Sequence, residues 1–147
     1  MTKLRKFADL SWNERWVLCR AAFLLLATEA GLRVLPFRRM LAWAQRCRGR
    51  NRGAGAANPE RIAWLVEVAA RRSWLRSTCL RKSLVLCALL RERGCAARLV
   101  IGTTSPRDGF QAHAWVELNG KILGSQAGAQ YQELAAFGNL NSGNQRA

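Results

Sequence analysis

Cys79 and His113 are the two residues whose types and positions point to shared chemistry. Cys79 follows Ser77 and Thr78, either of which can cap a helix, and it precedes a strongly apolar run. A free thiol has a pKa of about 8.5, and the partial positive charge at a helix N-terminus favours the thiolate. The unpaired amides of a first helical turn can also bind the oxyanion that forms when a thiolate attacks a carbonyl. The pattern predicts a cysteine nucleophile.

His113 is the only histidine of the chain, and it lies in residues 110–118, whose alternating character predicts a strand. An imidazole packed against the Cys79 helix can take the thiol proton and later donate it to a leaving amine. Taken separately, a cysteine at a helix start and a histidine in a strand are most often structural. Their order along the chain favours the catalytic interpretation.

Four helices are predicted to carry the first two thirds of the chain. Ser11 and Glu14 form a capping-box pattern, Pro36 and Pro59 suit a first helical turn, and Gly94 suits the position after a helix. We therefore expect helices over residues 11 to about 29 (ending before Gly31), 37 to about 48, 59 onward, and 79–93. Arg76, Arg81 and Lys82 would place positive charge near Cys79.

Three strands are predicted after the helices, over residues 97–102, 110–118 and 121–123, with Asn119-Gly120 as a tight hairpin turn. Helices followed by an antiparallel sheet indicate an α+β fold. The expected organisation is an N-terminal helical region (1–50), a core in which a central helix packs on the sheet (58–137), and a polar, disordered tail (138–147).

The composition is strongly basic, with a formal net charge of +15 at pH 7. This balance favours an acidic partner: nucleic acid, an anionic membrane surface or an acidic peptide. A coding bias towards arginine explains it equally well. The basic residues are scattered and form no recognisable nucleic-acid-binding motif, so nucleic acid is not an expected partner.

The five cysteines are an odd number without CxxC spacing, which argues against a disulfide framework or a zinc site. We expect reduced thiols in the cytoplasm, with no metal and no cofactor. The apolar run over residues 17–35 is broken by charges and predicts a buried helix rather than a membrane span. Peripheral membrane contact through Trp12 and Trp16 is a minority alternative.

Three motifs follow Cys79 in order: G-x-x-x-x-L-V-I-G (residues 94–102), F-x-A-H-A-W-V-E (110–117) and N-G-x-I-L (119–123). This order resembles that of the transglutaminase-like cysteine proteases, which have a papain-like core. Within them, the chain resembles the leader peptidases of lasso-peptide biosynthesis in their split form. The likeness covers roughly residues 4 to 137.

The resemblance implies that the protein removes the leader from a ribosomally made precursor peptide, with Cys79 as nucleophile and His113 as general base. It also implies three partners. These are the precursor's leader, a separate small protein that recognises the leader, and the ATP-dependent cyclase that closes the macrolactam ring. The sequence shows no additional leader-binding segment, as expected of the split form.

Position 125 departs from the family, whose third catalytic residue is an aspartate at the end of a motif like V-L-N-D. Here the corresponding residues 122–125 end in Ser125, which is the expected third site residue. A serine can orient an imidazole but cannot offset the charge of an imidazolium. Glu117 is about 13 Å from His113 by strand rise, and Asp108 lies in a turn. The alternative is a weak or inactive scaffold that docks the recognition protein and the cyclase.

Overall fold

The computed structural model describes residues 10–46, 58–72, 78–104, 111–124 and 131–138. Within these residues it contains four helices: α2 (Trp12–Val34), α3 (Phe37–Arg46), α4 (Pro59–Arg72) and α5 (Cys79–Glu92). The strands are β1 (Arg98–Thr103), β2 (Ala112–Leu118), β3 (Lys121–Leu123) and β4 (Gln132–Phe137). They form one antiparallel sheet in the order β3-β2-β1-β4.

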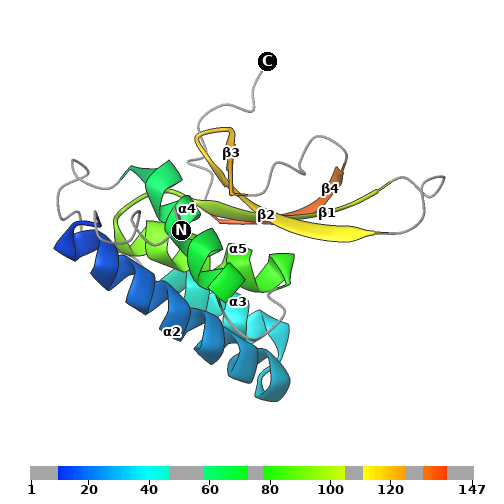
Figure 1. Ribbon diagram of the computed structural model, residues 1–147. Coiled ribbons are helices and arrows are strands. Elements are labelled where there is room, and N and C mark those ends of the chain that lie inside the picture. Colours follow the sequence, from blue (N-terminus) through cyan, green and yellow to red (C-terminus); the bar gives the residue numbers. More distant parts are fainter. Residues whose placement is uncertain (1–9, 47–57, 73–77, 105–110, 125–130, 139–147) are drawn as a thin grey trace.

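The sheet covers one side of α5, and α2 and α3 lie on its other side (Figure 1). The helices come first along the chain and the sheet follows. The predicted α+β fold, with a central helix packed on a small antiparallel sheet, is therefore confirmed.

The local signals that begin and end the elements act as predicted at most positions. Ser11 Oγ accepts from the Glu14 amide at 3.3 Å while Glu14 Oε2 accepts from the Ser11 amide at 2.9 Å, which completes the capping box. Gly94 has φ 81°, and Asn119 and Gly120 have φ 52° and 78°. These left-handed conformations end α5 and close the β2–β3 hairpin.

The first helix does not end before Gly31, as the sequence suggested, but continues to Val34. A Cβ built on Gly31 would lie 2.7 Å from Met40 Sδ of α3. This glycine therefore permits close packing of α2 against α3 and does not act as a terminator. The chain leaves the helix at Leu35, immediately before Pro36.

The sequence did not predict β4, which pairs with β1 from Leu99 to Thr103. Its residues, QELAAF, are mostly helix formers, and several of their side chains are exposed. Pairing with β1 decides the conformation here, because the tendency of a residue to form a strand depends more on its neighbours in the sheet than on the residue itself. The addition makes β1 a central strand of the sheet.

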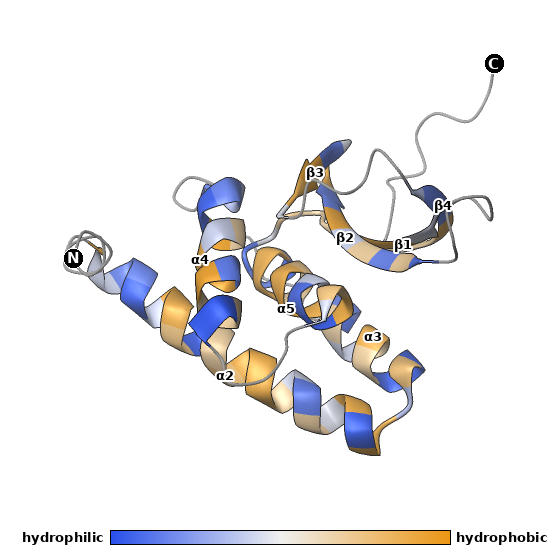
Figure 2. Ribbon diagram, turned by 45° about the vertical axis from the view of Figure 1, so that its right-hand side comes forward, coloured by the Kyte–Doolittle hydropathy of each residue, from blue (hydrophilic) through white to orange (hydrophobic). Residues whose placement is uncertain are grey.

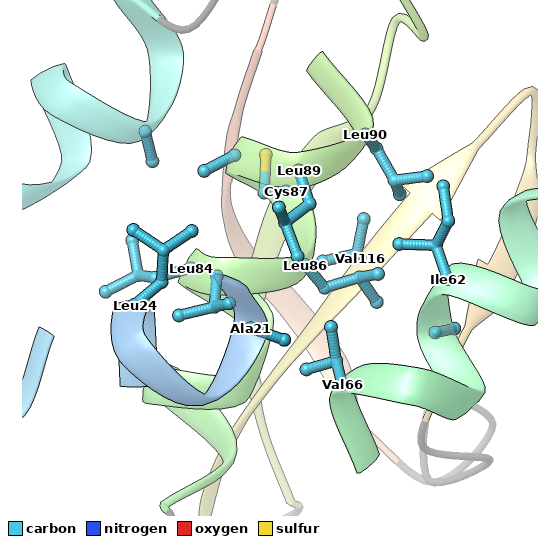
Figure 3. Close-up of a cluster of buried hydrophobic side chains, with 14 of the residues drawn as sticks. Ala21, Leu24, Ile62, Val66, Leu84, Leu86, Cys87, Leu89, Leu90 and Val116 are labelled. Carbon is cyan, nitrogen blue, oxygen red and sulfur yellow. The ribbon is translucent and has the colours of Figure 1, made fainter. Parts of the chain in front are cut away.

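The core is centred on α5. Its seven consecutive residues from Leu84 to Leu90 are each at most 4% exposed. Figure 3 shows members of this run, Leu84, Leu86, Cys87, Leu89 and Leu90, among side chains from other elements: Ala21 and Leu24 of α2, Ile62 and Val66 of α4, and Val116 of β2. A helix buried on all sides is held firmly in place. The position of Cys79, its first residue, is fixed by this packing.

In the part of the chain that the structure describes, no helix is sufficiently long and apolar to cross a membrane. The four cysteines described there, Cys19, Cys79, Cys87 and Cys95, are free thiols.

Candidate active site

Cys79 is the first residue of α5, as predicted, and its side chain is half-buried. It lines a pocket formed where α5 meets the sheet and α4. The other residues lining this pocket are Ala63, Val66, Glu67, Lys82, Ser83, Leu86, Ala114, Leu123 and Gly124. The thiol therefore lies in a recess formed by both layers of the fold.

Among the described residues, no side chain caps the amides at the start of α5. Thr78 has the extended conformation of an N-cap residue, with φ −69° and ψ 155°, but its hydroxyl makes no capping hydrogen bond. Instead, Thr78 Oγ1 accepts a hydrogen bond from Arg81 Nε at 3.3 Å. As far as the described residues go, the first-turn amides remain available to an anion beside the Cys79 thiol.

The cations predicted near Cys79 have different surroundings. Arg81 is buried and forms an ion pair with Glu29 of α2, so its charge is balanced within the helical layer. Lys82 lines the Cys79 pocket, and its Nζ lies 3.0 Å from Glu67 Oε2. Arg76 lies outside the described residues. Of the two predicted cations that the structure describes, Lys82 is the one that shares the pocket of the thiol.

His113 lies near the start of β2, where it pairs with Gly102 of β1. Its imidazole stacks on Tyr131, with centroids 5.0 Å apart, and on Trp115, with centroids 6.3 Å apart. Alternation along the strand places His113, Trp115 and Glu117 on one face, while Ala114 and Val116 join the core around α5. The imidazole is thus packed among aromatic rings.

The imidazole is partly desolvated and electrically biased towards its neutral form. Burial lowers the pKa of His113 from its ordinary value of 6.5, and the positive charge of Lys82 lowers this pKa further. Nε2 is buried and has no hydrogen-bond partner among the described residues. A neutral ring with an unpaired nitrogen is suited to act as a proton acceptor.

The described structure relates Cys79 to His113 through Ala114. The imidazole does not pack on the start of α5, as the sequence suggested, but lies with Trp115 on the face of β2 opposite to Ala114, and it does not line the Cys79 pocket. Ser83 Oγ donates to the Ala114 carbonyl at 2.9 Å, and Ala114, the residue after His113, lines the Cys79 pocket. In the described part of the chain, no hydrogen bond joins the thiol to the imidazole.

Glu117, the acid nearest to His113 along β2, is engaged elsewhere. Its Oε1 accepts from Trp115 Nε1 at 3.0 Å, and its Oε2 lies 2.6 Å from Arg98 Nη2. Glu117 therefore holds the tryptophan that stacks on His113. The two other candidates for the third catalytic position, Ser125 and Asp108, lie outside the described residues.

Sequence reasoning missed Tyr131, Gly102 and Glu67 as residues around the site. A Cβ at Gly102 would lie 2.7 Å from Trp115 Cη2 and 2.6 Å from the Gln132 carbonyl oxygen. A glycine inside a strand is a recognised sign of close approach, so this signal was present in the sequence. Tyr131 and Glu67 reach the site only through tertiary packing and had no comparable local signal.

Residues 22–136 match the family model described as the transglutaminase-like superfamily. No curated protein and no solved structure matches the chain significantly. The matched segment runs from α2 to β4 and includes both Cys79 and His113. It spans well over half of the 147 residues. The chain therefore belongs to the transglutaminase-like superfamily.

Proposed function

We propose that this protein is a cysteine peptidase that removes the leader from a lasso-peptide precursor. The superfamily includes cysteine peptidases, and the resemblance of the motifs around Cys79 and His113 supports the narrower assignment. One observation carries the proposal: a half-buried thiol lies at the start of α5, where Thr78 makes no capping hydrogen bond, in a pocket shared with Ala114 of β2.

The proposed reaction begins when His113 accepts the Cys79 proton. Sγ then forms a bond to the scissile carbonyl carbon, and the carbonyl oxygen becomes an oxyanion bound by the first-turn amides of α5. Collapse of this intermediate breaks the C–N bond, and the imidazolium gives its proton to the leaving amine. Water, deprotonated by His113, then hydrolyses the thioester and restores the thiol.

The proposal assigns delivery of the substrate to other proteins. By resemblance, a small recognition protein binds the leader and presents the precursor, and the cyclase acts on the released core peptide.

The decisive experiment incubates the purified chain with a candidate precursor and its recognition protein and follows the masses of the products. We expect Cys79→Ala and His113→Ala to abolish cleavage. Cys19→Ala is the matched control, because Cys19 is an exposed thiol on α2 outside the pocket. Undiminished cleavage by the Cys79→Ala protein would overturn the proposal.

A non-cutting scaffold is the second candidate, favoured by the serine at position 125 and by the net charge of +15. Ser125→Asp discriminates between the two. A peptidase that lacks its family's carboxylate should cleave faster with the aspartate, because a carboxylate stabilises the imidazolium. A scaffold would bind the recognition protein and the cyclase equally well with either residue and would show no cleavage.

A further inference from the structure

The outward side of α2 carries a continuous apolar stripe. Trp12, Trp16, Phe23, Leu26 and Val34 are 86%, 63%, 68%, 53% and 82% exposed. At 100° per residue, these five positions fall within a sector of about 80° around the helix axis. They therefore form one line along the whole length of α2, and we call them the α2 stripe.

The α2 stripe is too large to be an ordinary scatter of exposed apolar residues. Each aromatic side chain presents roughly 150–250 Å², so the three rings alone approach the size of the largest patch on a typical monomer. The opposite side of α2 is buried, at Val17, Ala21, Leu24 and Leu25 among others. Figure 2 shows apolar bands recurring along α2. A helix that is apolar on both sides is normally covered on both.

The charges beside the stripe are positive. The exposed charged residues of α2 are Arg15, Arg20 and Arg33, and the exposed Arg38 and Arg39 follow at the start of α3. Arg20 is paired with Glu92 of α5 and Arg33 with Glu29, but the arginines outnumber these acids. The acids of α2, Glu14 and Glu29, are only partly exposed and are each paired with arginines. The rim of the stripe therefore suits a negatively charged partner.

The place of α2 in the fold makes the stripe accessible to a flat surface. α2 is the outermost helix, on the side of α5 that faces away from the sheet (Figure 1). Its 23 residues extend for about 34 Å. A single straight ridge can contact a planar surface along its full length, and tryptophans with flanking arginines are typical of helices that lie in a membrane interface.

We propose that the α2 stripe binds the surface of an anionic lipid bilayer. The aromatic rings and Leu26 would enter the boundary between headgroups and acyl chains, and the arginine rim would contact lipid phosphates. The sheet, which contributes Ala114 and Leu123 to the Cys79 pocket, would face away from the lipid. The protein would thus work at the membrane surface with its pocket open to solution.

Cosedimentation of the full chain with vesicles tests the proposal. We expect binding to vesicles of phosphatidylcholine with phosphatidylglycerol, weaker binding to phosphatidylcholine alone, and weakening by salt. The double variant Trp12→Ser/Trp16→Ser should lower the partition coefficient about tenfold or more. Leu134→Ser is the matched control: Leu134 is an apolar side chain of β4 and is 66% exposed. It should leave binding unchanged.

A second measurement keeps the test valid if the serine variant folds poorly. In Trp12→Phe/Trp16→Phe the stripe stays apolar, so binding should persist while quenching of tryptophan fluorescence by brominated lipids falls. Three outcomes would overturn the proposal: no pelleting above the vesicle-free level, equal binding by the folded serine variant, or equal binding to neutral vesicles. A dimer in lipid-free solution that the serine variant abolishes would instead assign the stripe to a second copy of the chain.

Discussion

The imidazole of His113 stacks on the ring of Tyr131, with centroids 5.0 Å apart and planes inclined by 26°. Tyr131 immediately precedes β4, and β4 reaches this position because it pairs with β1. β4, which the sequence did not predict, therefore places the Tyr131 ring against the imidazole of the predicted general base. The Trp115 ring is the second aromatic neighbour of the imidazole, with ring centroids 6.3 Å apart.

Tyr131→Ala should lower kcat for precursor cleavage roughly three- to tenfold, because an aromatic contact of this kind is worth about 0.5–1.5 kcal/mol. The freed imidazole would sample orientations that cannot receive the thiol proton. Tyr131→Phe keeps the ring and should retain activity close to that of the wild type. Equal losses in the two variants would show that the hydroxyl matters rather than the stacking.

Lys82→Gln should raise the pKa of His113 towards 6.5, because removing the positive charge makes protonation of the imidazole easier. The measurement is an NMR titration of the imidazole, which is unambiguous because the chain has one histidine. Lys121→Gln makes the same change of charge on β3 and should leave this pKa in place. A pKa unchanged in Lys82→Gln would show that burial alone sets the titration.

Folding stability should fall as the pH is lowered from 6.5 through the lower pKa of folded His113. In that window the unfolded chain binds a proton at this residue and the folded chain does not, so acid favours unfolding. Above pH 6.5 the imidazole is neutral in both states and its contribution is fully present. Urea unfolding at several pH values measures the effect, and His113→Asn should remove this part of the pH dependence.

The parts of the fold predicted from sequence are those decided by local chemistry. The capping box at Ser11, the left-handed turn at Asn119-Gly120 and the start of α5 at Cys79 each depend on residues adjacent in the chain. β4 was not predicted, because its helix-favouring residues become a strand only by pairing with β1.

In the candidate site, too, the features set by local sequence were predicted and the contacts between distant segments were not. Cys79 and His113 were predicted from residue type and from the periodicity of their own elements. The Glu67–Lys82 pair and the stacking of Tyr131 on His113 join distant segments. Arg81 was predicted to lie near the thiol, but its charge is balanced by Glu29, 52 residues away in sequence. Such pairings depend on how α2, α4 and α5 pack, which no local pattern specifies.

Gly102→Ala should destabilise the protein by about 1–3 kcal/mol, because overpacking forces neighbouring groups to shift. The added methyl would meet both the Trp115 ring and the backbone at Gln132. The Trp115 ring beside His113 would therefore move, and cleavage would slow. Gly31→Ala is the matched control, since it meets the flexible side chain of Met40 far from the pocket. Thermal unfolding together with the cleavage assay separates the two effects. A Gly102→Ala protein with unchanged stability and activity would contradict this packing argument.

Glu29→Ala should destabilise the protein by about 3–5 kcal/mol, because it removes the carboxylate paired with the buried Arg81. The double variant Glu29→Leu/Arg81→Met should recover much of this loss, since apolar side chains of similar size often replace a buried ion pair without cost. The double variant also removes the Arg81 donor to Thr78, which frees this hydroxyl to cap the amides beside Cys79. Urea unfolding measures the recovery, and the cleavage assay should then show slower turnover in a stable protein. Full activity in the stable double variant would show that the engagement of Thr78 by Arg81 is unimportant for catalysis.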